Sequence, residues 1–173
     1  GGCCGTTPDH IRAIREAIDA HDLETELHDV EIQNNVPIEI DIEIPEQTRI
    51  QKKLSEGDFV IAVEMDPPRG FSTHKLMAGA SLLADAGADC IDVADSPMAR
   101  MRMSPWGVCQ MIQNKLGVDA TLHFPTRGRN LLRVQGDLLA AHALGIRNVF
   151  VVMGDPTAIG DYPDAMDNYD LVP

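Results

Sequence analysis

Four apolar runs, rich in β-branched residues, recur about every 30 residues in the second two thirds of the chain. They occupy residues 59–65, 90–95, 120–124 and 148–153. Short runs that are apolar on both faces are typical of strands buried in a parallel sheet. The pattern therefore predicts four parallel strands.

Amphipathic stretches separate the four runs and predict three helices, over roughly residues 73–86, 105–116 and 130–144. A glycine follows each stretch, at Gly87, Gly117 and Gly145. Glycine is the residue that the C-terminal end of a helix favours. The order β-α-β-α-β-α-β indicates an α/β fold with helices covering a parallel sheet, either a (β/α)8 barrel or a doubly wound sheet.

Polar residues at the ends of the runs favour the barrel. No run is followed by a GxGxxG or GxxxxGK[ST] loop, which would indicate a nucleotide-binding doubly wound sheet. Instead, an acid or a histidine stands near the C-terminal end of each run, where a barrel has its active site. These residues are Glu64, Asp66, Asp92, Asp95, His123 and Asp155. Four strands are half of a closed barrel, so we expect the first four β/α units of a TIM barrel within a longer chain.

The first third of the chain lacks this alternation of apolar runs and amphipathic stretches. Thr-Pro-Asp at 7–9, followed by isoleucines at helical spacing, predicts a helix that ends near Asp22. Residues 22–46 are acidic and contain two prolines, which favours a solvated linker. Isoleucines that alternate with acids over 38–44 leave a short edge strand as the alternative. A short helix over 47–56 follows.

Charge and cysteine usage narrow the class of protein. The net charge is -13, and residues 1–57 carry 13 acidic and 5 basic side chains. Such a chain disfavours nonspecific nucleic-acid binding, because phosphates are repelled. No apolar run approaches the roughly 20 residues of a membrane span. The four cysteines, Cys3, Cys4, Cys90 and Cys109, do not form the pattern of a disulfide framework, so we expect reduced thiols in a cytoplasmic protein.

Cys3 and Cys4 stand side by side in the glycine-rich stretch GGCCGTT, residues 1–7. Thiolates are ligands that zinc prefers, and flanking glycines permit the sharp turn that brings both sulfurs to one metal. A vicinal redox pair and two buried thiols are the alternatives. Two ligands do not complete a zinc site, so at least one more must come from elsewhere.

Glu64, Asp155 and His123 are the other candidates for chemistry. A carboxylate that closes an apolar strand is expected to be partly desolvated, which raises its pKa and suits it to general acid work. The alternative for Glu64 is a pair with an arginine such as Arg69, and for Asp155 a turn or helix-capping role. His123 either contacts a cofactor or is a hydrogen-bonded histidine at the rim.

GGCCGTTPDHIRAI, residues 1–14, resembles the C-terminal signature of the zinc-dependent homocysteine S-methyltransferases. The resemblance implies that Cys3 and Cys4, together with a third cysteine far upstream in that family, hold a catalytic zinc. The zinc binds homocysteine and lowers the pKa of its thiol. Cys90 and Cys109 lie outside the matching region, so we expect this sequence alone to hold zinc poorly or not at all.

Residues 58–160 resemble the start of the 5,10-methylenetetrahydrofolate reductases, in the pieces VEMDPPRG, LADAGADCIDVADSP, LHFPTRGRN and GIRNVFVVMGDP. That family is a (β/α)8 barrel that binds FAD without a Rossmann motif. NAD(P)H reduces the flavin, which passes hydride to methylenetetrahydrofolate. By this resemblance Glu64 is the acid that helps open the folate ring, Asp155 lies near flavin and folate, and His123 contacts the flavin. Gly154 lets the backbone approach the cofactor closely.

Two positions depart from the reductase pattern. Many reductases have Arg where this chain has Met153, and Thr where it has Ala94. The resemblance therefore does not carry the flavin contacts of those two side chains over to this chain.

The order of the two motifs resembles a bacterial fusion of homocysteine S-methyltransferase with methylenetetrahydrofolate reductase. We expect the C-terminal end of the first domain at 1–21, an acidic linker at 22–50 and the N-terminal half of the reductase domain at 51–173. The implied function is folate reduction joined to zinc-dependent methyl transfer to homocysteine, giving methionine. Folate and homocysteine are then the partners, without nucleic acid or membrane.

Two other classes stay open: a non-enzymatic short chain, and a pterin-binding barrel without flavin. The first and fourth strands of this sequence are expected to be open edges with exposed apolar faces. We therefore expect the isolated chain to have negligible reductase activity. The choice of nicotinamide, the methyl donor and the oligomeric state, a homo-oligomer included, are not fixed by the sequence.

Overall fold

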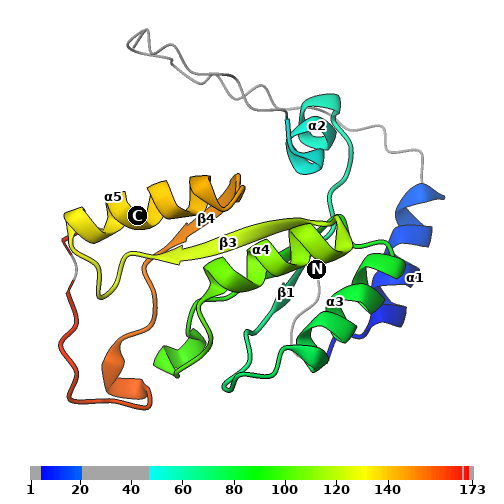
Figure 1. Cartoon of the computed structure of the whole chain (residues 1–173). Helices are drawn as coiled ribbons and strands as arrows, with labels where there is room; N and C mark the ends of the chain where they lie inside the picture. Colours follow the sequence, from blue (N-terminus) through cyan, green and yellow to red (C-terminus); the bar gives the residue numbers. More distant parts are fainter. Residues whose placement is uncertain (1–4, 21–46, 169, 172–173) are drawn as a thin grey trace, which may run out of the picture.

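The computed structural model describes residues 5–20, 47–168 and 170–171. Four parallel strands form one sheet in the order β1-β2-β3-β4 (Figure 1). The strands are β1 (Ala62–Met65), β2 (Cys90–Val93), β3 (Asp119–Pro125) and β4 (Asn148–Val152). Each strand lies beside the next one in the chain, with no reversal of order, which is the arrangement of a partial (β/α)8 barrel.

Helices follow the first three strands as predicted. They are α3 (His74–Asp85), α4 (Pro105–Leu116) and α5 (Leu131–Ala143), each within one residue of its predicted bounds. Two helices precede β1, α1 (Pro8–Asp19) and α2 (Arg49–Glu56), and two 3-10 turns, η1 (Pro97–Ala99) and η2 (Thr157–Ile159), lie in the loops after β2 and β4. None of the helices in the described ranges has the length and apolar content needed to cross a bilayer.

The main core lies between the sheet and the helices. Its fully buried side chains come from β2, β3 and α4 and include Ile91, Val93, Leu122, Val108 and Ile112. Among the described residues, Cys109 is a free thiol in this core, and Cys90 is a buried free thiol on the opposite face of β2, with its Sγ 3.0 Å from Thr121 Oγ1. Burial raises the pKa of each to about 12, so both stay protonated at neutral pH. The prediction of reduced cysteines is confirmed for these two, and Cys3 and Cys4 lie outside the described residues.

β1 and β4 are the edges of the sheet, as expected. Val149, Phe150 and Val151 of β4 are 37%, 55% and 50% exposed, so this edge strand presents apolar side chains on both of its faces. A strand of that composition is suited to burial between a neighbouring strand and helices. The predicted exposure of the fourth strand is therefore confirmed.

α1 packs beside α3, on the helix-covered side of β1. Ile11 is buried there, and Ile14 is partly buried against the same cluster, which includes Ile61 and Leu83. The isoleucine spacing predicted this helix but not its partner, and α1 ends at Asp19, three residues before the predicted Asp22. The predicted linker and its alternative edge strand at 38–44 fall in residues that the structure does not describe.

Asp89, in the loop before β2, joins α1 and α2 to the N-terminal edge of the sheet. Its carboxylate accepts hydrogen bonds from Arg15 at 2.5 Å, from Lys53 at 2.7 Å and from the backbone N–H of Ile61 at 2.9 Å. Desolvation raises the pKa of Asp89. The bonds from Lys53, Ile61 and Arg15 outweigh this and hold the pKa below its ordinary value of 3.8.

Because the pKa of Asp89 is lowered in the folded state, its contribution to the free energy of unfolding falls as the pH falls. Asp89 stabilises the fold above pH 3.8, and this stabilisation is lost as the pH falls through the lower pKa of the folded state. We expect Asp89→Asn to lower the free energy of unfolding at neutral pH, and the gap to wild type to shrink below pH 3.8. Urea unfolding at a series of pH values measures this. Asp9→Asn, in an exposed pair with Arg12, is the control, and a gap that stays constant with pH contradicts the assignment.

Candidate functional site

The register of the parallel strands brings a row of polar side chains to one face of the sheet. Residues paired across parallel strands point to the same face, and this face is opposite the one that holds Val93 and Leu122 in the core. The strand register aligns four polar residues here, one from each strand: Glu64, Asp92, Thr121 and Asn148. A hollow of about 440 Å³ lies against the β2–β4 part of the row, lined in part by Asp92, Thr121 and Phe150.

Glu64 is exposed at this face and makes no hydrogen bond or ion pair with any residue that the structure describes. The proposed alternative, a pair with Arg69, is therefore not present. The partial desolvation expected from the sequence is not present either, because the face of the sheet around Glu64 is open. The arginine that does reach this region is Arg102, which bonds Asp66 at 3.0 Å. Glu64 is thus a carboxylate left free for a ligand.

Asp155 positions a loop. Its Oδ2 accepts a hydrogen bond of 2.6 Å from the backbone N–H of Met98, in the loop that follows β2. Ser96, Met98 and Ala99 in that loop have φ angles of 50°, 56° and 52°. Non-glycine residues are strained in this left-handed region and are held there by surrounding contacts. Asp155 supplies one such contact, which agrees with its alternative role in a turn and leaves its second oxygen available.

The loops after β2 and β4 lie side by side at the rim. The N–H of Met101 donates to Asp161 at 2.9 Å. Gly160 comes so close to Ala99 that a Cβ at residue 160 would stand 2.1 Å from the carbonyl oxygen of Ala99. Only a glycine permits this approach, so the two loops form one edge of the site.

His123 and Gly154 complete the predicted set. The His123 ring contacts the ring of Phe150 on β4, with centroids 5.2 Å apart, and makes no hydrogen bond to the described residues. Gly154 has a φ of 87°, and a Cβ there would meet Pro125 Cβ at 2.9 Å and Arg127 Nε at 3.2 Å. The close approach at Gly154 is therefore toward the end of β3; an approach to a cofactor stays a prediction.

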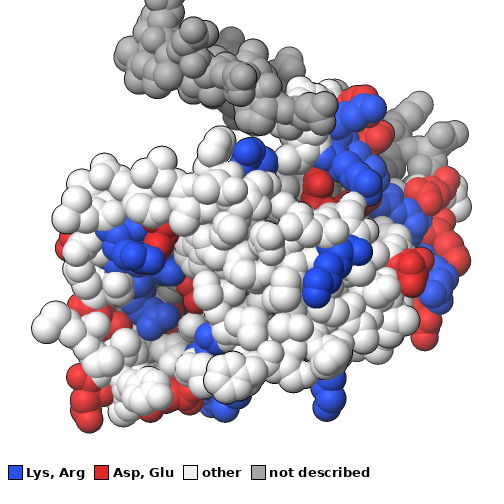
Figure 2. Space-filling model, in the orientation of Figure 1, with Lys and Arg blue, Asp and Glu red and all other residues white. Residues whose placement is uncertain are grey.

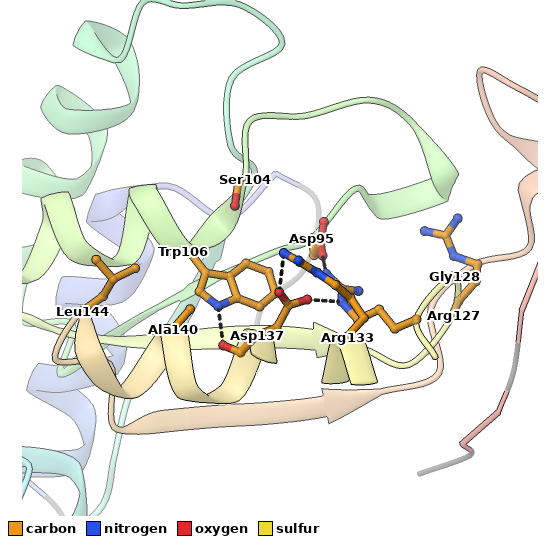
Figure 3. A pocket seen from close by; sticks show the side chains of 10 residues that line it. Asp95, Ser104, Trp106, Arg127, Gly128, Arg133, Asp137, Ala140 and Leu144 are labelled. Atoms are coloured by element: carbon orange, nitrogen blue, oxygen red, sulfur yellow. Dashed lines mark hydrogen bonds and ion pairs between the residues drawn. The ribbon is translucent and has the colours of Figure 1, made fainter. Parts of the chain in front are cut away.

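A network of ion pairs that includes Asp95, Asp137 and Arg133 lies beside the rim (Figure 3). Arg129 organises it: its guanidinium bonds Asp95 at 2.8 Å and Asp137 at 3.1 Å, and it lies over the rings of Trp106 and Phe124. Asp95, expected from the sequence among the polar residues of the rim, is neutralised by Arg129, as Asp66 is by Arg102. Both acids are positioned by arginines that lie far from them in the sequence.

A pocket of about 650 Å³ opens over this network, between α4, α5 and the loop after β3. Its lining includes three arginines, Arg127, Arg129 and Arg133. Figure 2 shows basic side chains gathered around a hollow on the corresponding part of the surface. Two buried polar atoms at the end of β3, Thr126 Oγ1 and Arg127 Nε, have no hydrogen-bond partner in the described structure. Of these two residues, Arg127 lines the pocket, and its unpaired guanidinium nitrogen fits an anionic ligand.

The described residues can be compared with only one of the two expected cofactors, the flavin. Among residues 5–20, 47–168 and 170–171, no group of three or more His, Cys, Asp or Glu side chains could hold a metal ion. Cys3 and Cys4, the predicted zinc ligands, lie outside these residues. A flavin, with a flat apolar ring system and polar phosphates, fits the rim, because Phe150, Met98 and Met153 expose apolar side chains and Arg127 offers an unpaired cation.

Sequence reasoning missed Arg127 and Arg129. The signal was present, since TRGRN directly follows the third strand and places two cations at the rim. The strand-end pattern was interpreted for acids and histidine alone, which leaves out these two cations. The left-handed segment 96–99 carried no such signal, because DSPMAR contains no glycine.

Comparison with protein-family models gives two matches. Residues 49–171 match the methylenetetrahydrofolate reductase family, a range that contains the whole sheet and every rim residue described above. Residues 1–18 match the homocysteine S-methyltransferase family, a range that contains Cys3 and Cys4 and most of α1. The order of the two matches fits a fusion of these two domains.

Proposed function

We propose, because the chain belongs to the methylenetetrahydrofolate reductase family, that its β/α units are part of a flavin-dependent TIM barrel that makes 5-methyltetrahydrofolate. The two family matches support folate reduction and methyl transfer to homocysteine. The observation that carries the proposal is the free carboxylate of Glu64 in a row of polar side chains at the open face of the parallel sheet. FAD, reduced by NAD(P)H, supplies the hydride.

Glu64 is proposed as the general acid of the folate step. The methylene carbon of 5,10-methylenetetrahydrofolate is bridged between two nitrogens and accepts hydride only after one C–N bond breaks. Glu64 donates its proton to the nitrogen that leaves, which opens the ring to an iminium ion. The hydride then adds to that carbon and gives the methyl group. Glu64 has no ion-pair partner among the described residues, which supports this role, since a carboxylate held by an arginine would be a poor proton donor.

Asp155 and His123 are proposed to orient the cofactor. Asp155 lies at the end of β4, where the bond from Met98 fixes one carboxylate oxygen and leaves the other for a flavin or folate N–H. His123, paired with the Phe150 ring, offers a flat surface and a ring N–H to the flavin. Gly154 keeps the backbone beside Asp155 free of a side chain.

The methyl transfer is proposed to use the first residues of the chain. Cys3 and Cys4 lie within the homocysteine S-methyltransferase match and are proposed as two ligands of a zinc ion, with a third thiolate from outside this sequence. Zinc bound in this way lowers the pKa of the homocysteine thiol and makes it a nucleophile at neutral pH.

A cytoplasmic enzyme that acts on small molecules is the setting we propose. The buried free thiols of Cys90 and Cys109 support a reducing compartment. The net charge of -13 supports small-molecule substrates rather than nucleic acid.

The experiment uses the full-length protein that contains this segment. The purified protein is incubated with NADH or NADPH and methylenetetrahydrofolate, and the product is identified by mass, while zinc is assayed by elemental analysis. We expect 5-methyltetrahydrofolate and about one zinc ion per chain, the number that one catalytic site holds. Formation of 5-methyltetrahydrofolate by a protein that contains no zinc would support the reductase function and contradict the assignment of Cys3 and Cys4 as zinc ligands. A protein that binds a pterin without reducing it would contradict the proposal and favour a pterin-binding barrel.

A further inference from the structure

Arg127 is an arginine at the rim of the barrel whose side chain is unpaired in the described structure. Its Nε is buried and has no hydrogen-bond partner, and its guanidinium makes no ion pair or hydrogen bond within the described residues. In Figure 3 it lies at the side of the pocket opposite Trp106, and no dashed line ends on it. An unpaired buried donor is unfavourable, so a guanidinium kept in this state is suited to an anion that arrives from outside the chain.

Among the three arginines that line this pocket, Arg127 is the one without a partner in the described structure. Asp95 and Asp137, the acids of the same pocket, are already bonded by Arg129, and Asp137 also bonds Arg133 at 2.7 Å. Asp155, which follows Gly154 in the chain, bonds the N–H of Met98 instead. Arg127 is therefore the arginine of this pocket that no carboxylate of the described structure neutralises.

The position of Arg127 connects the pocket to the proposed active site. Its Nε lies 3.2 Å from the place where a Cβ of residue 154 would stand, so the side chain runs along Gly154 next to Asp155. A guanidinium that no carboxylate bonds is a donor suited to phosphate oxygens, because its planar fork can bond two of them at once.

We propose that Arg127 binds the diphosphate of the FAD cofactor. This inference rests on the proposed function. The flavin ring then lies along the rim toward His123 and Asp155, and the pocket of about 650 Å³ beyond Arg127 receives the adenylate half. Residue 153, at the end of β4, is an uncharged methionine. Arg127, at the end of β3, supplies the positive charge beside it.

The test compares flavins that differ in their phosphates. Flavin-free full-length protein is titrated with FAD and with riboflavin, and binding is followed by quenching of flavin fluorescence. Since a charge-assisted hydrogen bond contributes about 1.5–3 kcal/mol, we expect Arg127→Gln to weaken FAD binding by about 10- to 100-fold and to leave riboflavin binding unchanged. Arg127→Lys, which keeps the charge, is expected to retain part of the FAD affinity.

The control is Arg100→Gln, which removes an exposed rim arginine whose side chain has no partner in the described structure. It should leave both flavin affinities unchanged. Equal weakening of FAD and riboflavin by Arg127→Gln would show a purely structural role and overturn the proposal. Unchanged FAD affinity would also overturn it, and a raised KM for NAD(P)H in that case would assign Arg127 to the nicotinamide dinucleotide. Wild-type protein that binds no flavin would remove the proposed function itself, which separates the two failures.

Discussion

Glu64→Gln is expected to slow the reduction of methylenetetrahydrofolate by about 10²- to 10⁴-fold, the usual contribution of a general acid, and to leave flavin reduction by NAD(P)H unchanged. The substitution keeps the size of the side chain and removes its proton. Only the folate step uses that proton, because a C–N bond must break before the carbon accepts hydride. Glu64 also makes no bond with the described residues, so the change removes no contact that stabilises the rim.

Anaerobic stopped-flow absorbance measures the two half-reactions separately in the full-length protein. Glu56→Gln, at the exposed C-terminal end of α2, is the matched control and should leave both rates unchanged. Equal slowing of both half-reactions by Glu64→Gln would indicate a general disturbance of the site. An unchanged folate rate would exclude Glu64 as the acid.

Arg129→Met is expected to lower the free energy of unfolding by about 3–5 kcal/mol, the typical effect of breaking a buried ion pair by removing one partner. Only 15% of the Arg129 side chain is exposed, and its two acids, Asp95 and Asp137, are 14% and 9% exposed. Methionine fills a similar volume but leaves Asp95 without its cation in a poorly solvated place. Asp137 keeps its bond to Arg133, which places the expected loss toward the lower end of this range.

Urea unfolding followed by far-ultraviolet circular dichroism measures the loss. Arg12→Met, in an exposed pair with Asp9, is the control, and we expect it to cost at most about 1 kcal/mol. Adding Asp95→Asn to Arg129→Met should recover part of the stability, because it removes the charge that was left unpaired. A loss no larger than that of the control, or no recovery in the double variant, would contradict a buried network held by Arg129.

The regular elements were predictable because local sequence dictates them. Continuous apolar runs placed the strands and period-3.6 patterns placed the helices, and the bounds of α3, α4 and α5 fall within one residue of the prediction. Gly87, Gly117 and Gly145 were predicted to end helices, and all three have the positive φ that this position requires. β1 is shorter than predicted, because 59–61 precede the pairing with β2.

The partners of the site residues were not predictable, because tertiary contacts decide them. The strand-end pattern placed Glu64, His123 and Asp155 at the rim. It could not show that Asp66 is bonded by Arg102, 36 residues away, or Asp95 by Arg129, 34 residues away.

The backbone conformation of the loop after β2 was also not predictable from the sequence. Ser96, Met98 and Ala99 adopt left-handed conformations that their residue types disfavour, and contacts with the loop after β4 hold them there. The isoleucine face of α1 predicted a helix, but the choice of α3 and β1 as its partners depends on the surface that those elements leave open.

One anaerobic titration of the full-length protein tests the central claim that this is a flavin-dependent folate reductase barrel. The visible spectrum is recorded as purified, after one equivalent of NADH or NADPH, and after addition of methylenetetrahydrofolate. We predict a flavin spectrum that the nicotinamide bleaches and that methylenetetrahydrofolate restores, since the hydride passes from one to the other through the cofactor. A protein without a flavin spectrum, or a reduced flavin that the folate does not reoxidise, would contradict the account.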